Sequence, residues 1–155
     1  MRIIFDNEKY EKQIKRIEKS ASAILCLPKK SSIELDFVEK DEIQEINKRT
    51  RGIDKITDVL SFPNLDITAG EKIKIKDFPF DVDYDTGMLN LGSIVVCVDK
   101  ILEQAIEYGT GEDREFCYLL AHGICHVVGY DHMEEEDKAK MRQKEEQILK
   151  KAKVW

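Results

Sequence analysis

One motif dominates the 155-residue sequence: Ala121-His122-Gly123-Ile124-Cys125-His126-Val127-Val128-Gly129-Tyr130-Asp131-His132. It contains all 3 histidines of the protein. His122 and His126 are four residues apart, so on a helix both side chains point the same way and one metal ion can bridge them. Gly129 can end that helix in a left-handed conformation, which returns the chain so that His132 can reach the same ion. The motif therefore predicts a three-histidine metal site.

The spacing of these histidines is the ligand spacing of the metzincin peptidases, which also have a glycine where Gly129 stands. Those enzymes place a general-base glutamate directly after the first histidine, and this sequence has Gly123 there. Three protein ligands leave a fourth tetrahedral position open, which is typical of catalytic zinc. The alternative, three unrelated histidines, is disfavoured because the spacing is so specific. The motif thus indicates catalytic zinc without the proteolytic base.

Size and composition predict one domain over residues 1–155, since 18.0 kDa is enough to bury a core. No apolar run is long enough for a membrane span, and the start of the sequence has no signal-peptide apolar region. The 4 cysteines form no Cys-x-x-Cys pair, so we expect reduced thiols and a cytoplasmic protein. Cys125 lies between two ligands, and we favour packing over metal contact for it.

The net charge of -6 argues against a protein that is basic overall and binds nucleic acid through that charge. The distribution of the charges matters more than their sum. Lysine and arginine exceed acidic residues in the first thirty positions, and Lys48, Arg49, Arg51 and Lys55 form a second basic cluster in what we expect to be a polar loop. A local basic groove is therefore compatible with the acidic total.

Hydrophobic periodicity divides the remaining sequence into short elements. Strands are predicted at 3–5, 33–38, 59–62 and 91–98, the last of them buried and central. Helices are predicted at 8–25, 41–47, 100–108, 112–128 and 133–151. Residues 64–90 are predicted to form a long surface loop that could contain an exposed strand at 72–76.

The helix predicted at 112–128 carries the first two histidines and is apolar around most of its circumference. Such a helix is expected at the centre of a domain. Only the stripe with Glu115, Tyr118, His122 and His126 is polar or aromatic. We therefore expect a buried central helix that presents one stripe to a cleft.

At this level of detail the sequence resembles the YbeY family of bacterial endoribonucleases and ribosome-maturation factors. The resemblance covers almost the whole length. It depends first on the histidine motif, on the segment Thr57-Asp58-Val59-Leu60-Ser61-Phe62-Pro63, and on residues 47–51 before that segment. It also depends on Leu91-Gly92-x-Ile94 and on Met141, Glu145 and Ile148-Leu149 in the closing helix.

The resemblance implies an α+β fold, in which a small mixed sheet of about four strands packs with about five helices. It implies one zinc ion per chain on His122, His126 and His132, and a catalytic role for Arg51 facing the metal cleft. It also implies cleavage of single-stranded RNA, with a part in maturing the 3′ end of small-subunit ribosomal RNA and in ribosome quality control. The implied partners are ribosomal RNA and the small subunit or its assembly factors.

Two positions depart from the family pattern. Ser93 stands where the family usually has aspartate after Leu-Gly, and Cys125 replaces a leucine-type residue before the second histidine. Neither change removes a ligand. With Ser93, however, the chain lacks a carboxylate that could have contacted a metal-binding residue without binding the metal itself.

In the mechanism that we infer, zinc polarises a phosphate oxygen or lowers the pKa of bound water to about 7. Arg51 would clamp the scissile phosphate, because a guanidinium matches it bidentately. Asp131 is a candidate general base, although orienting a ligand histidine is an equally good role for it. Two alternatives remain open: a peptidase-like zinc hydrolase, which Gly123 disfavours, and a non-enzymatic ribosome-assembly factor whose zinc is structural, which an open coordination site disfavours.

Overall fold

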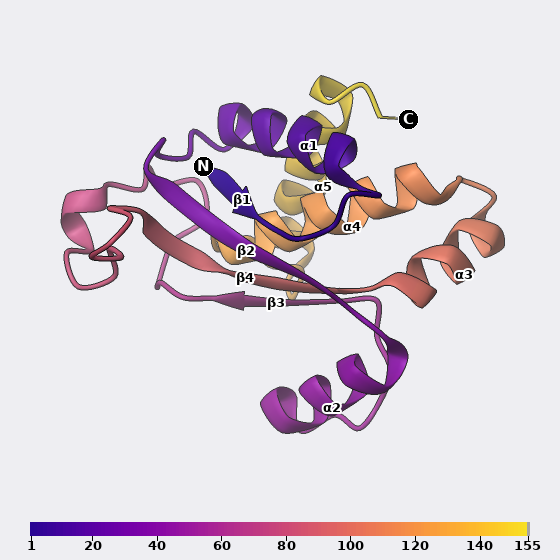
Figure 1. The fold of residues 1–155 in the computed structure, drawn as a ribbon. Helices are drawn as coiled ribbons and strands as arrows, with labels where there is room; N and C mark the ends of the chain where they lie inside the picture. Colours follow the sequence, from indigo (N-terminus) through magenta and orange to yellow (C-terminus); the bar gives the residue numbers. More distant parts are fainter. Residues whose placement is uncertain (155) are drawn as a thin grey trace.

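A mixed four-stranded sheet organises the protein in the computed structural model, which describes residues 1–154 (Figure 1). The strands lie in the order β1 (Arg2–Ile4), β2 (Ser31–Val38), β4 (Leu89–Cys97) and β3 (Val59–Pro63). The first three are parallel, and β3 runs antiparallel to β4. The predicted strands are thus confirmed, with β4 in an inner position as its apolar sequence indicates.

Five α-helices surround this sheet, so the predicted α+β fold is confirmed. They are α1 (Glu11–Ile24), α2 (Lys40–Arg51), α3 (Val98–Tyr108), α4 (Glu112–Val127) and α5 (Glu135–Lys151), with a short 3-10 helix η1 (Ile75–Asp77). Figure 1 shows α1, α4 and α5 on one side of the sheet and α2 on the other. Within residues 1–154, no helix combines the length and apolar character that a membrane span needs.

Helix α4 lies at the centre, as its apolar circumference predicts. It packs against α1, α3 and α5 and against strands β3 and β4. Ile94 of β4 points toward α4, where it contacts Gly123. Its neighbour Val95 points to the opposite face and joins a small cluster with Ile43 and Leu60. The site-bearing helix is therefore fixed on several sides by the core.

The predicted second helix continues further than expected, and this corrects the position of Arg51. Residues 48–51 were expected in a polar loop, but α2 extends through Arg51. The Gly52 N–H donates to the Lys48 carbonyl (3.0 Å) at the end of the helix. Basic residues suit the last helical turn, because its carbonyl ends carry partial negative charge. The polarity of this segment therefore reflects a solvated helix end rather than a loop.

The segment 64–90 contains no strand at 72–76, so that prediction was wrong. Before β4 begins at Leu89, its regular structure is the single turn of η1 and an isolated bridge between Val82 and Leu89. Leu65 and Ile73 are buried in the main core. The alternating lysines and isoleucines therefore reflect anchoring of a loop by its apolar side chains.

Candidate metal centre

The structure brings His122, His126 and His132 together, although His132 lies beyond the end of α4. One ring nitrogen from each lies within 4.8 Å of the others. The ring centroid of His126 lies 4.6 Å from that of His122 and 4.9 Å from that of His132. In tetrahedral geometry one zinc ion holds two nitrogens about 3.3 Å apart. The three nitrogens are therefore close enough together to be candidate ligands of one metal ion.

The third histidine reaches the cluster because the chain reverses at Gly129, where φ is +99°. The Tyr130 N–H donates to the Cys125 carbonyl (3.0 Å), which closes the end of the helix. The Asp131 carboxylate then accepts a hydrogen bond from the backbone N–H of His132 (2.7 Å). Asp131 thus fixes the backbone of a ligand position, which differs from both roles considered for it from the sequence.

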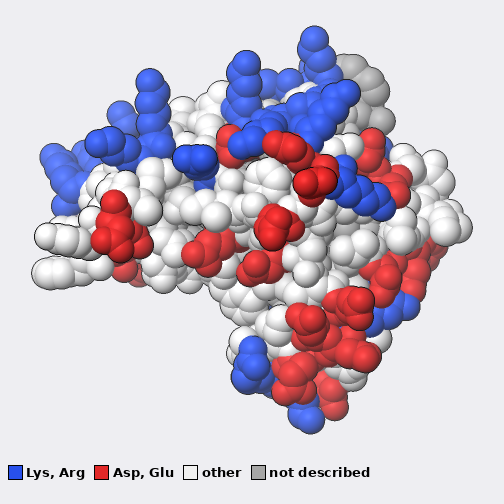
Figure 2. All heavy atoms as spheres, viewed as in Figure 1, with Lys and Arg blue, Asp and Glu red and all other residues white. Residues whose placement is uncertain are grey.

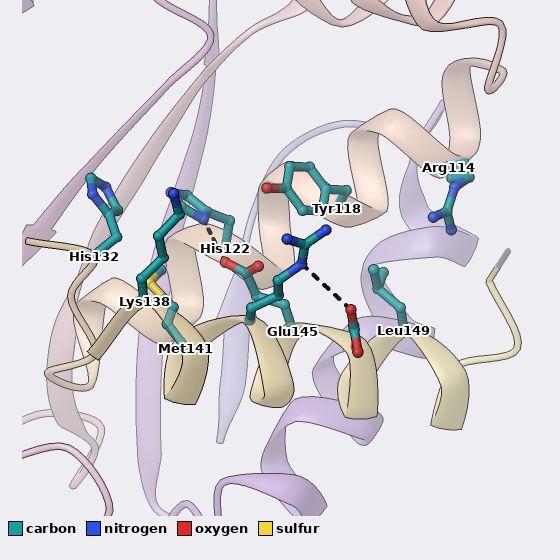
Figure 3. Close-up of a pocket in the computed structure, with 10 residues that line it drawn as sticks. Arg114, Tyr118, His122, His132, Lys138, Met141, Glu145 and Leu149 are labelled. Atoms are coloured by element: carbon teal, nitrogen blue, oxygen red, sulfur yellow. Dashed lines mark hydrogen bonds and ion pairs between the residues drawn. The ribbon is translucent and has the colours of Figure 1, made fainter. Parts of the chain in front are cut away.

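Glu145 on α5 orients the first histidine and is the residue that sequence reasoning missed. Its Oε1 lies 2.6 Å from His122 Nδ1, and its side chain is almost fully buried (Figure 3). With Nδ1–H donating to this carboxylate, the lone pair of His122 is on Nε2 and is free for a metal. A signal was present in the sequence: an acid one turn after Met141, on the inward face of an amphipathic helix.

The surroundings of His126 favour its neutral imidazole. Burial lowers the pKa of His126, and its neighbours His122 and His132 lower it further. A neutral ring keeps the lone pair that a metal needs. Cys125 is fully buried in the core, and burial raises the pKa of its thiol, so it is a packing residue. The donor set is therefore three imidazoles, which fits a catalytic zinc site.

A cleft opens beside the three histidines, and Arg51 lines it. The other walls come from the start of β3, including Asp58 and Ser61, and from Asp131 and Met133 after the motif. Arg51 is the last residue of α2. The side-chain amide of Asn47, one turn earlier, donates to the Lys55 carbonyl (3.0 Å) and ties the helix end to the following loop. Arg51 thus lines the same cleft as the three histidines, and it does so from a helix end rather than from a loop.

Ser93 does not bear on this site. Side chains alternate along β4, and Ile94 points to α4. Ser93 therefore shares the opposite face with Val95 and with its β3 partner Phe62. An acid at position 93 would also have pointed away from the histidines.

Gly123 permits the close approach of α4 to the sheet. A Cβ at this position would lie 3.0–3.3 Å from side-chain atoms of Ile94. We expect Gly123→Glu to destabilise the protein by several kcal/mol, because an unpaired carboxylate would be buried against the sheet. We also expect it to gain no chelator-sensitive hydrolysis of casein. Urea denaturation and a casein assay measure the two effects, and a stable variant that digests casein would contradict both.

Comparison with known proteins identifies the family of the chain. A family model described as "Endoribonuclease YbeY" matches residues 2–153. A curated protein of that name from Clostridium botulinum strain 657 is 46% identical over 147 residues, which cover 93% of this chain and 89% of the relative. A second, from strain Eklund 17B, is 49% identical over 123 residues, which cover 77% of this chain and 74% of the relative.

A solved structure supports the fold. The solution structure of TM1509 from Thermotoga maritima matches with a TM-score of 0.59 at 25% sequence identity. The match covers 97% of this chain and 87% of that one. The overall fold of this chain is therefore similar to that of an experimentally determined protein.

Proposed function

The chain belongs to the YbeY endoribonuclease family, and we propose that it is a zinc-dependent endoribonuclease that cleaves single-stranded RNA. The family makes it an enzyme that hydrolyses RNA. The observation that supports zinc dependence is the cluster of His122, His126 and His132 at the wall of an open cleft. An open face suits catalysis, because a structural zinc site is closed by a fourth protein ligand.

We further propose that its substrate is the 3′ end of small-subunit ribosomal RNA, and that it acts in ribosome quality control with the small subunit or its assembly factors. The resemblance of the whole sequence to this family supports that role. The four cysteines are free thiols, as in proteins of a reducing compartment, which supports a cytoplasmic location. Helices from both chain ends, α1 and α5, pack together, which supports one domain over residues 1–155.

The charge distribution is compatible with an RNA substrate despite the acidic total. Figure 2 shows lysines and arginines gathered along the top of this view, over α1 and over the loop region with η1 to its left, and many acidic side chains over α2 and α3. Since exposed charges more than about 8–10 Å apart are largely screened at physiological salt, a phosphate responds to its local surroundings. The net charge of -6 therefore does not exclude a polyanionic substrate.

In the mechanism, each residue of the chain has a separate task. Arg51 binds the scissile phosphate in its cleft and stabilises the charge that develops there. Glu145 holds His122 in the tautomer that presents Nε2. Asp131 holds the His132 backbone. When bound to the histidines, zinc supplies Lewis acidity toward a phosphate oxygen and the attacking water.

Substituting Arg51 tests this assignment. We expect Arg51→Ala to lower kcat/KM for single-stranded RNA by about 10²–10³-fold, the cost of removing one group that stabilises transition-state charge. Metal content should stay the same and stability should fall by at most about 1 kcal/mol, because the side chain is exposed at a helix end. Arg51→Lys should remain impaired, since a point charge lacks the planar fork.

Arg49→Ala is the matched control, because Arg49 is an exposed arginine of the same helical turn that does not line the cleft. It should cleave RNA like the wild type. Normal cleavage by Arg51→Ala, or an equal loss in both variants, would remove the phosphate-binding role from Arg51.

A further inference from the structure

A second cleft lies between α4 and α5 and meets the Arg51 cleft at His122 and His132. We refer to it as the α4–α5 cleft. Its volume is about 460 Å³. Figure 3 shows side chains from both helices projecting into it beside the two histidines. Because its wall contains two of the proposed metal ligands, a molecule bound here would lie next to the reacting centre.

The α4–α5 cleft offers an aromatic surface beside the metal site. Tyr118 precedes His122 by one helical turn, and their ring centroids are 6.0 Å apart. The tyrosine is 39% exposed, although most of α4 is buried. Met141 and Leu149 of α5 are buried and form an apolar floor below it. A flat, apolar ring system such as a nucleobase can stack on a surface of this kind.

The rim of the α4–α5 cleft is basic. Arg114 lies one turn before Tyr118 on α4, and Lys138 and Arg142 lie one turn apart on α5. The carboxylates of the cleft are already engaged, Glu145 by His122 and Glu146 by Arg142 at 3.6 Å. Within residues 1–154, Arg114 and Lys138 form no ion pair. Their charges are therefore available to phosphate groups.

The length of the cleft suits more than one nucleotide. Arg114 and His122 are eight residues apart on one helix, which corresponds to roughly 12 Å along its axis. An endonuclease cuts within a strand, so RNA must extend on both sides of the scissile phosphate. The α4–α5 cleft begins at the same histidines and combines aromatic, apolar and basic groups. These are the groups that bind single-stranded nucleic acid.

We propose that the α4–α5 cleft is a second RNA subsite, in which Tyr118 stacks on a base next to the scissile bond and Arg114 and Lys138 hold phosphates. This inference rests on the proposed endoribonuclease function and adds a path for the strand. RNA extends from Arg51 past the histidines into the α4–α5 cleft. Tyr118 is a positioning residue, because it holds the strand without contacting the reacting atoms.

The test combines binding and cleavage on the full-length, zinc-loaded protein. Binding is measured by fluorescence anisotropy with a labelled 2′-O-methyl oligoribonucleotide of ten nucleotides, and cleavage with the unmodified decamer. We expect Tyr118→Ala to raise Kd and KM by about 5- to 150-fold, the range that 1–3 kcal/mol of base stacking gives. Its kcat should change less than KM. Tyr118→Phe should behave like the wild type, because the ring is retained.

Salt dependence tests the basic rim. We expect Lys138→Ala to reduce the slope of log K against log salt by about 0.7, the contribution of one phosphate contact on a single strand. Tyr108→Ala and Lys140→Ala are matched controls, since both side chains are exposed and lie outside the cleft. They should leave Kd, KM and the salt slope unchanged.

The outcomes separate the two proposals. A wild type that binds and cleaves the decamer, together with Tyr118→Ala and Lys138→Ala variants that match it in Kd, KM and salt slope, would overturn the subsite while leaving the nuclease intact. A wild type that leaves the RNA uncut would overturn the proposed function, and the anisotropy measurements would still decide whether the cleft binds RNA. Equal losses in Tyr118→Phe and Tyr118→Ala would exclude stacking.

Discussion

Replacing His126 with alanine is expected to abolish metal binding and RNA cleavage together. His126 lies between the other two histidines in the cluster, and burial keeps its imidazole neutral and ready to bind. Two ligands hold zinc far more weakly than three, and without the ion the Lewis acidity is lost. We expect kcat/KM to fall by roughly 10⁴-fold, which corresponds to 5–6 kcal/mol of transition-state stabilisation. Metal analysis of the purified variant and cleavage of a labelled oligoribonucleotide measure both effects.

The stability of this variant shows whether the loss comes from the metal. With zinc present, the wild type should melt at a higher temperature than His126→Ala, because an ion that binds only the folded state stabilises it. A chelator should remove most of that difference. Cys125→Ala is the control from the adjacent position. It should keep the metal, because Cys125 is a packing residue. Full metal content in His126→Ala would show that the site assignment is wrong.

The fold was predictable from the sequence wherever the periodicity was local and strong. Helix α4 is apolar around most of its circumference and strand β4 is mostly apolar, and both lie in the core as predicted. The segment 72–76 suggested a strand because alternating lysine and isoleucine is the pattern of an exposed strand. A strand also needs a hydrogen-bonding partner, and no neighbouring strand lies beside this segment within residues 1–154. Whether a segment has a strand beside it depends on the tertiary fold, and hydrophobic periodicity does not show this.

The same distinction explains which site residues the sequence revealed. His122, His126 and His132 come from one short motif, so their spacing carries the geometry. Arg51 was proposed through family resemblance, and the helix that carries it to the cleft was not predicted. Glu145 lies 23 residues from the histidine that it orients. The sequence places Glu145 on the inward face of its helix, but only the packing of α5 against α4 brings it to His122.

The loop at 64–90 has a structural role at the metal site that its irregular sequence did not indicate. Its backbone passes directly over the turn that follows α4. A Cβ on Gly129 would overlap the Ile67 carbonyl oxygen and would lie 3.0 Å from the Ala69 nitrogen. The apolar side chains Leu65 and Ile73 anchor the loop on either side of this contact. The loop thus holds the turn that directs His132 to the other ligands.

This contact gives Gly129→Ala a large expected effect on stability. Gly129 has φ +99°, which an alanine adopts at a cost of about 1–3 kcal/mol. The added methyl group would also meet backbone atoms of the loop, which cannot rotate away as a side chain would. We expect a total loss of about 3–5 kcal/mol in the free energy of unfolding. Urea denaturation in the presence of a chelator measures it without a contribution from the metal.

Gly109→Ala separates the two causes. Gly109 also has a positive φ, +64°, but nothing lies within 4 Å of the position that its Cβ would occupy. Only the backbone strain applies there, and we expect a loss of about 1–2 kcal/mol. The excess in Gly129→Ala then measures the contact with the loop, and it should be accompanied by weaker zinc binding because His132 is displaced. Equal losses in the two variants, with unchanged zinc affinity, would show that the loop does not support the metal site.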